Sequence, residues 1–100
     1  MTVPIICELT PEALRTRRAG LLSGLARRAQ RLEETPDGYR LEFAASADTL
    51  HSITDVVDAE RQCCRWLRFQ LDVEPDGGRM VLTLSGPQGA REFLAALFER

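Results

Sequence analysis

The sequence contains no lysine, so all 13 of its basic residues are arginine, and it has a single histidine, tryptophan and tyrosine. No apolar run approaches the roughly 20 residues that a helix needs to span a bilayer. The first residues also lack the charged lead and long apolar core of a signal peptide. We therefore expect a cytoplasmic protein that makes no membrane contact.

An overall basic excess is missing as well. The net charge is −2 and the pI is near 5.4, whereas a general nucleic-acid binder carries a strong positive charge. No acidic residue lies between Glu12 and Glu33, however, and the arginines gather there. We interpret this stretch as the solvated face of a helix, or alternatively as a patch for phosphate or an acidic partner. Its members are Arg15, Arg17, Arg18, Arg27, Arg28 and Arg31.

The composition is that of an ordinary globular protein, with 44% hydrophobic and 28% charged residues. A chain of this length can bury roughly 65% of its unfolded surface, so neither a disulfide nor a metal is needed for stability. No internal repeat, low-complexity tract or long linker divides the sequence. We expect residues 1–100 to form a single domain.

Hydrophobic periodicity and turn residues predict elements in the order β-α-β-α-β-β-α. The predicted strands cover residues 3–9, 39–45, 67–73 and 79–85. The predicted helices run from Pro11 to about Leu32, from Ala47 to Cys64 or Arg65, and onward from Gly86-Pro87, with turns at 35–38 and 75–78. Strands with one polar face indicate helices on the other face only. The predicted fold is an α/β (α+β) two-layer sandwich with a mixed four-stranded sheet and helices on one face.

Three cysteines are present: Cys7 and the adjacent pair Cys63 and Cys64. Thiols are normally kept reduced in the cytoplasm, so we interpret them as thiols or metal ligands rather than as a disulfide framework. No Cys-x-x-Cys, Gly-rich phosphate loop or catalytic histidine partner accompanies them. The pattern therefore favours a binding protein over an enzyme.

Helical spacing places Glu60 within reach of both adjacent cysteines. At about 100° per residue, Cys64 falls on the apolar helix face with Ile53 and Val57, whereas Cys63 lies toward the flank. Glu60 stands three and four residues before the two sulfurs, so its carboxylate can approach either of them. Adjacent cysteines on an intact helix point away from each other. Joint chelation therefore requires the helix to end at the pair.

This cluster suits a soft ion. Three thiolates, or two thiolates with a carboxylate, prefer a thiophilic metal or metalloid ion, whereas structural zinc usually takes four sulfur or nitrogen ligands. We predict Cys63 and Cys64 as principal metal ligands, with Cys7 and Glu60 assisting. His51 points to the opposite helix face from Cys63 and is predicted to be a surface residue.

Two other interpretations stay open. In the first, Cys7 and Cys64 are small core residues, and the chain is a non-enzymatic protein-interaction module, with a homodimer as one form. In the second, the thiols perform redox or nucleophilic chemistry. Arg61 lies close to Cys64 in the sequence, and a nearby guanidinium group favours a reactive thiolate.

A set of short motifs covers nearly the whole chain. The central one is Glu60-Arg61-x-Cys63-Cys64-x-x-Leu67-x-Phe69, and Cys7-x-Leu9-Thr10-Pro11, Asp37-Gly38-Tyr39-Arg40-x-x-Phe43, Glu74-Pro75-x-Gly77-Gly78 and Leu84-x-Gly86-Pro87-x-Gly89 surround it. Together they resemble a family of small uncharacterised bacterial proteins, in which a phenylalanine is usual at the position of Trp66. Members of that family recur near mercury and other heavy-metal resistance functions. The resemblance therefore implies a heavy-metal role for the paired cysteines.

Overall fold

A computed structural model describes residues 21–98, except for the side chain of Cys63. Residues 21–28 are helical. The elements that follow are β1 (Arg31–Thr35), β2 (Gly38–Phe43), α2 (Ala47–Cys63), β3 (Arg68–Val73), β4 (Met80–Ser85) and α3 (Ala90–Leu97). The four strands form one sheet in the order β1-β2-β4-β3, and each neighbouring pair is antiparallel.

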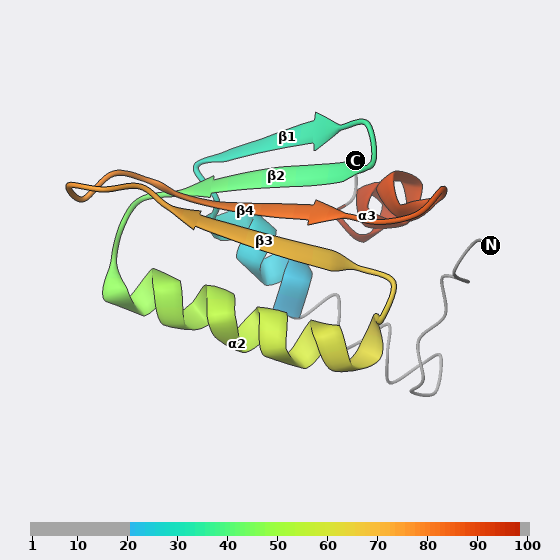
Figure 1. The fold of residues 1–100 in the computed structure, drawn as a ribbon, viewed down its shortest axis with the longest axis horizontal. Helices are drawn as coiled ribbons and strands as arrows, with labels where there is room; N and C mark the ends of the chain where they lie inside the picture. Colours follow the sequence, from blue (N-terminus) through green and yellow to red (C-terminus); the bar gives the residue numbers. More distant parts are fainter. Residues whose placement is uncertain (1–20, 99–100) are drawn as a thin grey trace.

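The sheet presents an apolar face to the helices. Strand register sets Leu41 of β2 beside Leu82 of β4, and Leu82 beside Leu71 of β3. Residues from the helical segment 21–28, from α2 and from α3 pack into one core with this face: Leu22, Leu25, Ile53, Val56, Ala90 and Leu94. Figure 1 shows the helices on one side of the sheet. The predicted two-layer sandwich with helices on one face is therefore confirmed.

The opposite face of the sheet is polar and carries an arginine–glutamate cluster. Glu42 on β2 is only 5% exposed, and Arg79 donates a hydrogen bond to its carboxylate. This bond, together with the positive charges of Arg79, Arg31 and Arg40, outweighs partial burial and lowers the pKa of the Glu42 carboxyl below its usual value. The cluster keeps a carboxylate charged at the centre of the polar face.

The hairpin between β3 and β4 fixes the register of these two strands. Asp76 and Gly77 both have positive φ, 56° and 69°, and the Gly78 N–H donates to the Pro75 carbonyl over 3.1 Å. Two central residues with positive φ define a type I′ turn, whose twist matches that of antiparallel strands. The predicted hairpin at 75–78 is therefore confirmed.

The first strand of the sheet corrects the sequence prediction. The helix expected to reach about Leu32 ends at residue 28. The backbone N–H of Gln30 donates to the carbonyl of Glu42 over 2.7 Å, and pairing continues from Arg31 opposite Glu42. Arg31 and Leu32, which helical spacing had assigned to the helix, therefore belong to a strand that pairs with β2.

This correction changes the expected sheet. Within residues 21–98 the four strands are all antiparallel, rather than mixed, and β1 over Arg31–Thr35 supplies the fourth strand. From residue 21 the element order is α-β-β-α-β-β-α. The predicted strand over residues 3–9 lies outside the described residues.

The boundaries of α2, β3 and β4 agree closely with the prediction, whereas β2 ends at Phe43 rather than at residue 45 and α3 begins at Ala90 rather than at Gly86-Pro87. Helix α2 was expected from Ala47 to Cys64 or Arg65 and ends at Cys63. The strands expected at 67–73 and 79–85 appear as β3 and β4, shortened by one residue each at the start. Among the residues that the structure describes, none of the helices combines the length and the apolar character that crossing a membrane requires.

Candidate functional site

The candidate site lies at the C-terminal end of α2, where the helix stops at the paired cysteines. Cys63 is the last helical residue, and Cys64 leaves the helix with φ −115° and ψ 79°. The backbone N–H of Cys64 still donates to the Glu60 carbonyl over 2.7 Å. The condition for joint use of the two cysteines, that the helix end at the pair, is therefore met.

Glu60 and Cys64 share the buried side of this helix end, as the spacing predicted. Each is only 1% exposed, and the Cys64 Sγ donates to the Glu60 Oε2 over 3.7 Å. A thiol is a weak donor, and a carboxyl group in an apolar core is costly unless it has polar partners. The pair therefore forms a polar position within the core.

A tight turn after Cys64 brings Trp66 into the same part of the core. The Leu67 N–H donates to the Cys64 carbonyl over 3.1 Å. Trp66 is 6% exposed and meets Phe93 edge-to-face, with ring centroids 5.2 Å apart. Its Nε1 is buried and has no hydrogen-bond partner among the residues that the structure describes. A buried indole donor therefore lies three residues beyond the end of α2, which the sequence did not reveal.

The sequence suggested that the guanidinium of Arg61 favours a reactive thiolate at Cys64, but the structure pairs this guanidinium with another residue. Its guanidinium forms an ion pair with Asp58 over 2.6 Å, and its side chain is 62% exposed. Asp58 thus holds this positive charge on the outer side of α2, whereas the Cys64 sulfur is buried. The geometry gives no support to activation of the Cys64 thiol by Arg61.

The structure describes two of the four predicted ligands together. Cys64 and Glu60 are in contact; Cys63 adjoins them in the chain, but its side chain is outside the described part, as is the whole of Cys7. Among the side chains that are described, no group of three His, Cys, Asp or Glu residues could hold a metal ion. His51 is exposed, which confirms the prediction that it lies at the surface.

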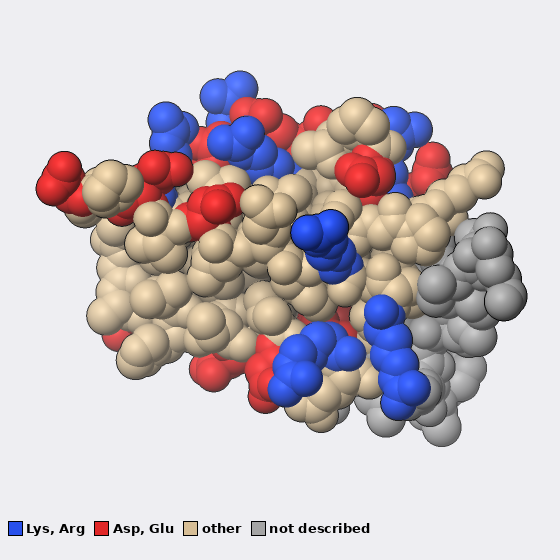
Figure 2. Space-filling model, viewed as in Figure 1, with Lys and Arg blue, Asp and Glu red and all other residues tan. Residues whose placement is uncertain are grey.

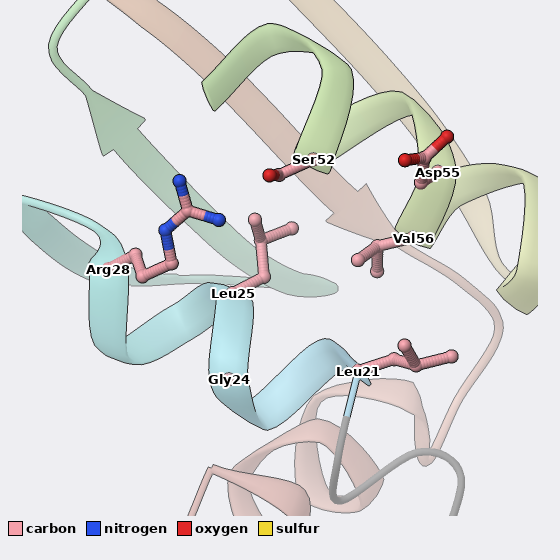
Figure 3. Close-up of a pocket in the computed structure, with 7 residues that line it drawn as sticks. All are labelled: Leu21, Gly24, Leu25, Arg28, Ser52, Asp55 and Val56. Carbon is pink, nitrogen blue, oxygen red and sulfur yellow. The ribbon is translucent and has the colours of Figure 1, made fainter. Parts of the chain in front are cut away.

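A groove that was not predicted from the sequence lies between the helical segment 21–28 and α2. This groove has a volume of about 330 Å³ and is lined by Leu21, Gly24, Leu25, Arg28, Ser52, Asp55 and Val56. Figure 3 shows Leu25 and Val56 on its apolar wall, with Arg28 reaching from one helix toward Ser52 on the other. The groove offers an apolar wall and a rim with charges of both signs.

The arginine-rich stretch divides between different parts of the fold. Arg28 lines the groove and Arg27 bonds to the Ser23 hydroxyl over 3.4 Å. Arg31, by contrast, lies on β1 and forms an ion pair with Glu33 over 2.5 Å. The three described arginines therefore do not form one helix face, because the helix ends before Arg31. The other members of the stretch lie outside the described residues.

Comparison of the chain with protein-family models, with curated proteins and with solved structures finds no match.

Proposed function

We propose that this chain is a cytoplasmic thiol protein that binds a soft metal or metalloid ion at the end of α2. Cys63 and Cys64 are the principal ligands in this proposal, and Cys7 and Glu60 assist. The observation that carries it is the contact between the Cys64 sulfur and the Glu60 carboxylate, both almost completely buried where the helix ends.

The composition of this buried position supports a binding role. Apolar side chains of similar volume would satisfy the core without the cost of burying polar groups. Real proteins depart from such packing rules at functional sites. The Cys64 thiol is a donor of the kind that soft ions prefer, and the Glu60 carboxyl group in contact with it supplies an additional oxygen donor.

The end of the helix supports the use of both cysteines. Adjacent residues within a helix project about 100° apart, but Cys64 has left the helical conformation. The backbone at Cys64 therefore does not impose the divergence that an intact helix would. In addition to Cys64 and Glu60, which are in contact, Cys63 and Cys7 are the other two proposed ligands.

The test is a competitive titration of the full-length, reduced protein with mercury(II), copper(I), zinc and arsenite, with native mass spectrometry as the readout. A small monothiol is present in excess. An isolated thiol loses its ion to this competitor, whereas converging ligands retain it because each further bond forms at high effective concentration. We expect one soft ion per chain to be retained, and zinc to be lost.

Variants assign the ligands. The double variant Cys63→Ser, Cys64→Ser should lose the ion, Cys7→Ser and Glu60→Gln should weaken retention, and the matched control His51→Ala should bind like the parent, because His51 is an exposed donor on the same helix. Circular dichroism shows whether each variant is folded. Equal retention by the parent and the double variant would contradict the proposal.

A further inference from the structure

Strand β3 forms an edge of the sheet within residues 21–98, since its only strand neighbour there is β4. Several of its side chains are exposed. At its end Val73 is 58% exposed, and it is the one exposed large hydrophobic residue in the described part of the chain. An edge strand presents unpaired backbone donors and acceptors, so it is a template for pairing with another strand.

The hydrogen-bond pattern shows which residues of β3 face outward. The Glu74 N–H donates to the Arg79 carbonyl over 3.2 Å, and the strand register continues this pairing. In an antiparallel pair, residues alternate between those that bond to the partner and those that do not. The backbone groups of Phe69 and Leu71 therefore point away from β4.

The side chains of β3 are arranged so that the strand is complementary to itself. Arg68 and Asp72 lie on the polar face, four residues apart around Gln70. Neither has an ion-pair partner among the residues that the structure describes. If two copies of β3 pair antiparallel about Gln70, each Arg68 stands opposite the other copy's Asp72, and each Phe69 opposite the other copy's Leu71.

We propose that two copies of this chain associate through antiparallel pairing of their β3 strands, centred on Gln70, to form one continuous sheet. The pairing uses the outward backbone groups of Phe69 and Leu71 for hydrogen bonds. It also forms two opposite-charge pairs on the polar face, where directly opposed side chains interact.

The surface around β3 fits this partner. Figure 2 shows a broad band of uncharged side chains over the face that displays β3 and α2, with only a few charged groups within it. On the apolar face of the sheet, Phe69 and Leu71 are partly buried members of the core periphery. Pairing of each with its counterpart extends the apolar layer from one copy into the next.

Light scattering coupled to size-exclusion chromatography tests the association, because the chain mass is 11.2 kDa and a dimer has twice that mass. Arg68→Glu or Asp72→Arg alone places like charges opposite each other at both pairs. We expect each change to raise the dimer dissociation constant by roughly tenfold to 100-fold. Glu74→Arg is the matched control, since it changes charge beside β3 but outside the proposed pairs.

Mixing the two single variants gives the sharpest outcome. In the mixed dimer, Glu at position 68 of one copy faces Arg at position 72 of the other, and Arg68 faces Asp72, so association should return. Amide hydrogen exchange adds a positional readout, because the N–H groups of Phe69 and Leu71 should be protected only when the chain is dimeric. A monomeric parent, a dimer insensitive to both charge changes, or unprotected amides at these positions would overturn the proposal.

Discussion

Replacement of Trp66 by phenylalanine is expected to leave the stability of the fold nearly unchanged, because two effects oppose each other. Trp66 is 6% exposed, and its Nε1 is buried without a hydrogen-bond partner in the described part of the chain. Removing an unsatisfied buried donor gains roughly 1–3 kcal/mol. The smaller ring forfeits the burial of about two or three methylene equivalents, roughly 2 kcal/mol at ~0.8 kcal/mol each. The net change in unfolding free energy should lie within about 1.5 kcal/mol of zero.

The comparison variant is Trp66→Ala, which removes the whole ring and its edge-to-face contact with Phe93. Truncation of this kind costs roughly 3–5 kcal/mol. Urea unfolding followed by far-ultraviolet circular dichroism measures both variants, since Trp66 is the sole tryptophan and its fluorescence is lost. If Trp66→Phe costs as much as Trp66→Ala, the indole N–H makes a stabilising bond and the reasoning is refuted.

Two further changes test the sheet. The pKa of Glu42 is lower in the folded protein than in the unfolded chain because Arg79 bonds to it, so its stabilisation is complete above the unfolded pKa and is lost as pH falls through the folded pKa. Urea midpoints measured across the acid range should therefore fall less steeply for Glu42→Gln than for the parent; equal slopes would contradict this. A Cβ at Gly38 would lie 1.8 Å from the Leu84 carbonyl oxygen, whereas one at Gly24 would meet nothing within 4 Å. Gly38→Ala should thus cost well over ~1 kcal/mol and the control Gly24→Ala should gain up to ~1 kcal/mol, as thermal unfolding will show; similar melting temperatures would refute the clash.

The second half of the chain could be predicted well because local signals agree there. Ser46 caps α2 by accepting the Thr49 N–H over 3.0 Å, and serine is among the residue types favoured at this position. Strict alternation marks β3, and the Asp-Gly turn marks the hairpin. The local sequence is therefore sufficient to recognise where these elements begin or end.

Strand β1 was missed although one signal for it was present. Its residues Arg31–Thr35 are mostly charged, and Leu32 continued the helical spacing of the preceding leucines. Pairing with β2, which no local pattern encodes, decides the conformation. The turn Pro36-Asp37 does join strands in many proteins, and a strand on each side of it would have been the better prediction.

The candidate site was predictable only in part. Helical spacing was sufficient to place Glu60 and Cys64 on one buried face, because four residues nearly complete a helical turn. The unused donor of Trp66 depends on what surrounds the ring in the folded core. The ion pair that holds Arg61 at the surface depends on Asp58, three residues earlier, and this competing partner was visible in the sequence.

Retention of mercury(II) against an excess of a small monothiol tests the central claim most directly. The parent and the double variant Cys63→Ser, Cys64→Ser are compared under identical reducing conditions. The account predicts one ion per parent chain, with the affinity of the double variant lower by more than about tenfold, or ~1.4 kcal/mol. Loss of the ion from both proteins to the competitor would show that the buried sulfur of Cys64 and its neighbours do not converge on a soft ion, and would contradict the account.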